Sequence, residues 1–73
     1  MADIQDVLKL DAAQVEALTY EQSRELLDVV VAALEDSELP LAELMKLWAV
    51  GEQIAKVCEG HLAAAAKQIE AEA

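Results

Sequence analysis

The residues best suited to chemistry are one thiol and one imidazole, Cys58 and His61, which stand three positions apart in a helical stretch. Side chains at that spacing lie on one face of a helix, where they could share a metal ion. Two ligands are too few for a closed tetrahedral zinc site, and the sequence holds no other cysteine or histidine. A metal would therefore need carboxylates or a symmetry-related copy. The simpler interpretation is a packed thiol beside an imidazole at the rim of the core.

The carboxylates offer no better case for catalysis. Glu35, Asp36 and Glu38 crowd one turn, and Glu70 and Glu72 stand near the end of the sequence. No histidine, lysine or serine is placed to form an acid–base pair with them in a shielded site. We therefore expect no catalytic, cofactor-binding or metal-binding residues, and we expect this chain alone to be non-catalytic.

The strongly acidic composition limits the possible partners. The chain has 15 acidic and 5 basic side chains, a formal net charge of −10, and the acids are spread along its whole length. Phosphate contacts need clustered Lys and Arg, so this charge argues against direct binding of nucleic acid or of an anionic membrane surface. The ordinary explanation is a solvated face that keeps a small protein dissolved. The functional alternative is docking onto a basic partner.

The first residues give no sign of export. MADIQDVLKLD is acidic and lacks the basic start and long apolar core of a signal peptide. No run approaches the roughly 18 apolar residues of a membrane span. A single cysteine allows no internal disulfide, which agrees with a reducing compartment. We therefore expect a cytoplasmic protein.

Composition and capping signals favour an all-α fold. Hydrophobic residues make up 56% of the chain but aromatic residues only 3%, so the apolar content is mainly Ala, Leu and Val, which suits helices. Thr19 followed three residues later by Gln22 is typical of a capping box. This signal predicts a first firm helix over about residues 20–36.

Pro40 marks the start of a second, longer helix, because proline is tolerated in the first turn and breaks the helix deeper inside. We expect a turn at 37–39 and a helix over about 40–70. Since so short a link makes neighbouring helices antiparallel, residues 19–73 should form a two-helix hairpin. Residues 1–18 carry a weaker pattern and are either a frayed leader or a short helix that orders against the open end of the hairpin.

Apolar residues recur every seven positions along the second helix, which predicts coiled-coil-like packing. The main row is Leu41, Trp48, Ala55, Leu62 and Ile69, and a second row is Leu44, Gly51, Cys58 and Ala65. Gly51 costs about 1 kcal/mol relative to Ala inside a helix, so we interpret it as a point of close approach between the two backbones. The predicted hairpin core consists of Tyr20, Leu27, Val30, Leu34, Leu41, Leu44, Trp48, Gly51, Ala55 and Cys58.

The second helix should overhang the first, because it would span about 45 Å and the first only about 25 Å at 1.5 Å per residue. An apolar row that continues past its cover indicates a contact surface. Either the leader folds back over it, or a second copy or a larger partner packs there. We favour an intermolecular contact and expect self-association of the isolated chain. Trp48 is then a core anchor or an interface hot spot, and the candidate partner interface consists of Trp48, Leu62, Ala65 and Ile69.

The segment LTYEQSRELLDVVVAALEDSELPLAELMKLWAVGEQIAKVCEGHL resembles the small subunit of bacterial exodeoxyribonuclease VII. The likeness covers about residues 18–69, and Ser37, Ala42 and Ala49 depart from the residues usual in that family. The motifs that carry it are Thr19-Tyr20-Glu21, Leu34-Glu35, Leu39-Pro40-Leu41, Leu47-Trp48 and Gly51-Glu52, together with Cys58 and Leu62.

The resemblance implies a non-catalytic subunit of a nuclease that degrades single-stranded DNA from either end into oligonucleotides. The large subunit would carry the DNA-binding domain and the hydrolytic site, with several small subunits bound along its helical region. The alternative, from the residues alone, is a free-standing helical adaptor or self-associating bundle unrelated to DNA.

Overall fold

The computed structural model describes residues 4–35 and 38–72, and within these residues it contains four helices and no strand. They are α1 (Ile4–Leu8), α2 (Ala12–Glu16), α3 (Tyr20–Leu34) and α4 (Leu41–Glu72). The predicted all-α fold is confirmed, and the long C-terminal helix packs on α3. Of the turn expected at 37–39, Ser37 lies outside the described residues.

A capping box starts α3, as the sequence predicts. The backbone N–H of Gln22 donates to Thr19 Oγ1 at 3.1 Å, and the backbone N–H of Thr19 donates to Gln22 Oε1 at 3.0 Å. These bonds satisfy two donors that the first turn of a helix leaves unpaired. At the start of α4, the carbonyl of Pro40 accepts the backbone N–H of Leu44 at 3.0 Å.

The leader is folded as two short helices, α1 and α2. Asp11, which interrupts the apolar pattern, is the N-cap of α2: its carboxylate accepts the backbone N–H of Gln14 at 2.8 Å, and Gln14 Oε1 accepts the backbone N–H of Asp11 at 2.9 Å. Val7 and Val15 are almost completely buried. Within residues 4–18 there are thus two short helices and not one, and each contributes a buried valine to the core.

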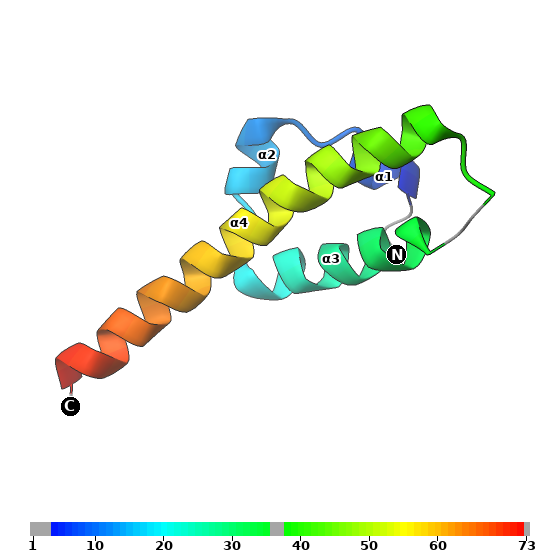
Figure 1. Cartoon of the computed structure of the whole chain (residues 1–73). Coiled ribbons are helices and arrows are strands. Elements are labelled where there is room, and N and C mark those ends of the chain that lie inside the picture. The colour runs from blue at the N-terminus through cyan, green and yellow to red at the C-terminus, as the bar shows by residue number, and fades with distance from the viewer. Residues whose placement is uncertain (1–3, 36–37, 73) are drawn as a thin grey trace.

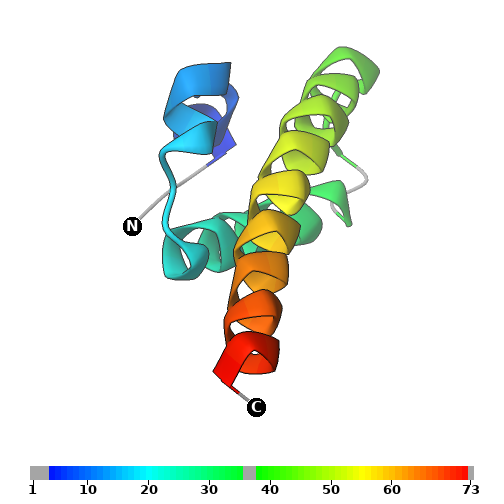
Figure 2. The ribbon, with the colours of Figure 1, turned by 90° about the vertical axis from the view of Figure 1, so that its left-hand side faces the viewer.

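The other three described helices pack around the first half of α4. α1 packs on α3 and α4, while α2 packs on α4. In Figures 1 and 2, α1 and α2 lie on one side of α4 and α3 lies on another. α3 and α4 run in opposite directions in Figure 1 and cross at an angle in Figure 2. The last turns of α4 extend beyond the other helices (Figure 1), which gives a shape of 49 × 23 × 21 Å.

The buried face of α4 is not centred on the main heptad row. Leu47 and Ile54 are completely buried, whereas Leu41 is 73% exposed and Trp48 is 67% exposed. The expectation that Leu41 and Trp48 line the hairpin core is therefore wrong for this chain. The reason is that three helices, α1, α2 and α3, pack on α4. The two short helices extend the buried face of α4 on the side away from Trp48. The buried core consists of Val7, Val15, Val30, Ala33, Leu47, Ile54 and Cys58.

The other residues of the predicted core differ in how far their side chains are buried. Val30, Gly51 and Cys58 are buried; those that are partly buried are Tyr20, Leu27, Leu34, Leu44 and Ala55.

Within the described residues, no helix combines the length and apolar character needed to cross a membrane.

Candidate functional site

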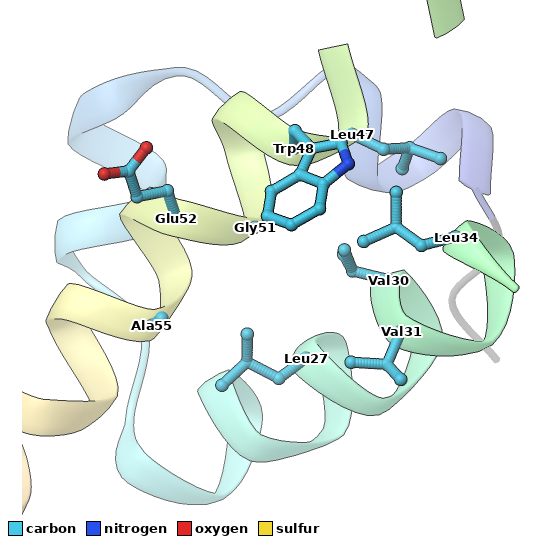
Figure 3. A pocket seen from close by; sticks show the side chains of 9 residues that line it. All are labelled: Leu27, Val30, Val31, Leu34, Leu47, Trp48, Gly51, Glu52 and Ala55. Atoms are coloured by element: carbon cyan, nitrogen blue, oxygen red, sulfur yellow. The ribbon is translucent and has the colours of Figure 1, made fainter. Parts of the chain in front are cut away.

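An apolar groove lies between α3 and α4 and has a volume of about 550 Å³. In Figure 3 the side chains of Leu27, Val31 and Leu34 reach toward the opening from α3, and the indole ring of Trp48 reaches toward it from α4. The carboxylate of Glu52 points away from these apolar groups (Figure 3). The residues that line the groove are Leu27, Val30, Val31, Leu34, Leu47, Trp48, Gly51, Glu52 and Ala55.

The floor of the groove is the contact between Gly51 and Val30. A Cβ atom placed on Gly51 would lie 2.9 Å from Cγ1 of Val30, closer than real Cβ contacts come. The close contact predicted at Gly51 is present, and its neighbour on α3 is Val30. Because glycine brings α4 against α3 here, the large side chains on either side stand up as the walls of a cleft.

Exposed apolar side chains continue the groove along α4. Leu62 is 52% exposed and Ile69 is 69% exposed, and both extend the row of Trp48 beyond the end of α3. Ala65, the remaining residue of the candidate interface, is also exposed. We call the row at seven-residue spacing the α4 seam; it consists of Leu41, Trp48, Ala55, Leu62 and Ile69.

Two carboxylates run along one edge of the α4 seam. Glu52 and Glu59 are exposed and stand four residues after Trp48 and Ala55. Successive residues of an α-helix are about 100° apart, so both carboxylates lie roughly 40° to one side of the seam. The lysines of α4 lie farther round the helix, roughly 100° to 140° from the seam; they are Lys46, Lys56 and Lys67.

Cys58 and His61 do not form a joint site. Cys58 is a buried free thiol, and the exposed His61 has its Nε2 atom 2.8 Å from the carbonyl oxygen of Leu18. A carbonyl can only accept, so this ring nitrogen carries the proton and donates it. Across residues 4–35 and 38–72, no group of three or more His, Cys, Asp or Glu is arranged to hold a metal ion. The site is therefore an apolar surface with an acidic edge.

The residues that sequence reasoning missed are Leu47 and Ile54 in α4 and the two leader valines. A signal for α4 was present, since Leu47, Gly51, Ile54 and Cys58 follow the four-three-four spacing of a buried helical face. The row of Leu41, Trp48, Ala55, Leu62 and Ile69 is also apolar at every seventh position, so the sequence contains two adjacent candidate rows.

Comparison with known proteins gives this chain its family. A family model described as "Exonuclease VII small subunit" matches residues 20–71. The chain belongs to the exonuclease VII small subunit family. The resemblance noted in the sequence motifs is thereby confirmed.

Similar proteins from several bacteria carry the name "Exodeoxyribonuclease 7 small subunit". The chain is 48% identical over 59 residues to that of Mycobacterium avium, which covers 81% of this chain and 72% of the relative. It is 46% identical over 56 residues to that of Corynebacterium aurimucosum, covering 77% of this chain but only 59% of the relative. It is 40% identical over 62 residues to that of Nocardia farcinica, which covers 85% of this chain and 80% of the relative. No solved structure matches the chain significantly.

Proposed function

We propose that this chain is the non-catalytic small subunit of an exodeoxyribonuclease VII, which binds the large catalytic subunit. The resulting enzyme degrades single-stranded DNA from both ends into oligonucleotides, in the cytoplasm. Family membership supports the role of subunit, and the observation that carries the binding role is the open apolar groove between α3 and α4. A surface of this kind is typical of a protein whose partner covers it.

The described residues also agree with a non-catalytic role. The α3–α4 groove contains one ionisable side chain, Glu52, and its carboxylate points away from the apolar walls (Figure 3). A hydrolytic site would need a positioned base, a metal or an oxyanion donor facing one point. In this proposal the helices α3 and α4 act as an antiparallel hairpin, and coiled-coil-like packing joins it to the large subunit.

The alternative is a helical adaptor or self-associating bundle unrelated to DNA. The net charge of −10 favours neither DNA binding nor association with an equally charged copy. The two functions are separated by a pull-down with the large subunit encoded in the same genome, followed by degradation of single-stranded DNA. We expect a stable complex and an activity that needs both chains. A chain that does not bind the large subunit, and does not change its activity, would support the alternative.

A further inference from the structure

We propose that the α4 seam and its groove bind one amphipathic helix of a different chain, with Lys or Arg along the edge that faces Glu52 and Glu59. These two carboxylates, we infer, also prevent a second copy of this chain from occupying the same surface. The helix is assigned to the large subunit, and that assignment rests on the function proposed above. The selectivity against a second copy does not depend on it.

The shape of the surface fits a helix. Apolar residues repeat every seven positions along α4, the spacing at which one helix follows another in a coiled coil. Within the groove the small residues Gly51 and Ala55 lie between the larger Leu27 and Trp48, so the groove can receive side chains from the facing helix. Binding of an amphipathic helix in an apolar groove is a common mode of protein recognition. The exposed Leu62 and Ile69 prolong the contact beyond the body of the protein.

The charges define the facing helix. Residues four positions after each seam residue form the edge that meets a partner, and in coiled coils the charges there select the partner. On α4 this edge carries Met45, Glu52, Glu59 and Ala66, with no basic residue. A helix with Lys or Arg opposite Glu52 and Glu59 would gain favourable pairs and faster encounter. A helix with acids there would be repelled.

The apolar pattern alone would permit a homodimer, which is the self-association expected from the sequence; the charges beside the seam argue against it. The α4 seam is symmetric about Ala55, so an antiparallel copy would set Leu41 against Ile69 and Trp48 against Leu62. The same arrangement brings Glu52 of each copy against Glu59 of the other, which places two pairs of like charges at the interface. Like charges directly opposed across an interface are destabilising.

A parallel copy would not neutralise the two carboxylates either. In a parallel pair, the edge carrying Glu52 and Glu59 faces the residues five positions earlier on the other helix, which are Leu47 and Ile54. Both are completely buried in the core of their own chain and neither can neutralise a carboxylate. In both orientations, α4 of a second copy therefore supplies no basic group, and only a different chain can complete the charge pattern.

The test is the exchange of one charge, Glu59→Lys, in the whole chain. In an antiparallel pair the new lysine of each copy faces Glu52 of the other, so repulsion becomes attraction at both places. We expect at least a tenfold increase in self-association, measured by sedimentation equilibrium, and a decrease of that gain at high salt. Glu70→Lys makes the same charge change on α4 away from the acidic edge, and it should associate as the parent does. Helix content by circular dichroism should be unchanged in both variants, since both side chains are exposed.

The same variants are tested against the large subunit. Glu59→Lys should weaken binding about tenfold at low salt and less at high salt, whereas Glu70→Lys should bind as the parent does. Equal binding and equal self-association in the two variants would overturn the proposal. A parent chain that is already a dimer, and becomes a monomer on Trp48→Asp, would overturn it as well. If the large subunit binds neither parent nor variants, the proposed function fails, and the self-association of Glu59→Lys alone then decides the selectivity claim.

Discussion

The imidazole Nε2 of His61 lies 2.8 Å from the carbonyl oxygen of Leu18, 43 positions earlier in the chain. Leu18 stands in the link between α2 and α3, so this hydrogen bond joins α4 to the start of α3 at the point where α4 leaves the body of the protein. Beyond it, the residues of α4 are exposed. The bond therefore ties α4 to the segment before α3, next to the overhanging end.

Replacing His61 with alanine should destabilise the protein by about 0.5 to 1.5 kcal/mol, the usual net contribution of a hydrogen bond. Alanine is the better helix former, so the backbone preference acts in the opposite direction and cannot cause the loss. Urea unfolding followed by circular dichroism measures the difference. Gln68→Ala, an exposed change two turns further on, is the control and should have little effect. A stability equal to that of the parent would mean that the bond contributes nothing.

The contact between Gly51 and Val30 predicts opposite effects at the two glycines. Gly51→Ala places a methyl group 2.9 Å from Cγ1 of the buried, β-branched Val30, whereas nothing lies within 4 Å of a Cβ at Gly60. Gly60→Ala should stabilise the helix by up to about 1 kcal/mol. Gly51→Leu should destabilise the protein by about 1 to 3 kcal/mol because of overpacking. Thermal melts compare the variants, and a Gly51→Leu protein as stable as the parent would show that α3 and α4 are not in close contact here.

The buried leader should be needed for full stability. Val15 is only 2% exposed, and truncating it to alanine removes two buried methyl groups at a cost of about 1 to 3 kcal/mol. Glu16→Ala, an exposed change at the next position, should have an effect within about 0.5 kcal/mol. Both are measured by urea unfolding. Equal midpoints would indicate that α2 does not pack on α4 in solution.

Local signals in the sequence were enough to identify the main helices. Thr19 and Gln22 form a capping box within one turn of helix, and Pro40 marks a helix start in the same local way. Both signals can be recognised without knowledge of the rest of the fold. A second capping box, formed by Asp11 and Gln14, lies in a weak apolar pattern, where an acidic residue can be either an interruption or a helix cap.

The buried face of α4 could not be derived in the same way. Trp48 and Leu47 are adjacent, and both belong to plausible apolar rows, so the choice depends on which other helices pack on α4. Val7 and Val15 cover the flank that would otherwise face water, and short leader helices of five residues have too little periodicity to predict that contact. Tertiary packing decided between two patterns that the sequence leaves nearly equivalent.

The overhanging end of α4 should be an interface. Changing Leu62 and Ile69 together to aspartate places two charges on exposed positions, so the helix content of the isolated chain should remain largely intact. Binding to the large subunit should be lost, because charges at the centre of an apolar contact are left desolvated. Surface plasmon resonance measures the binding, and Ala63→Asp on the same turns of α4 is a control for added charge. Parental affinity in the double variant would move the search to the face around Trp48.

Reconstitution of the nuclease tests the central claim most directly. The large subunit is mixed with the parent chain, with Trp48→Asp or with no addition, and the release of oligonucleotides from single-stranded DNA is measured. We expect full activity only with the parent, loss of at least tenfold with Trp48→Asp, and no cleavage by the parent chain alone. Equal activity in all mixtures, or cleavage by the purified chain that is lost when one of its own carboxylates is replaced, would contradict the account.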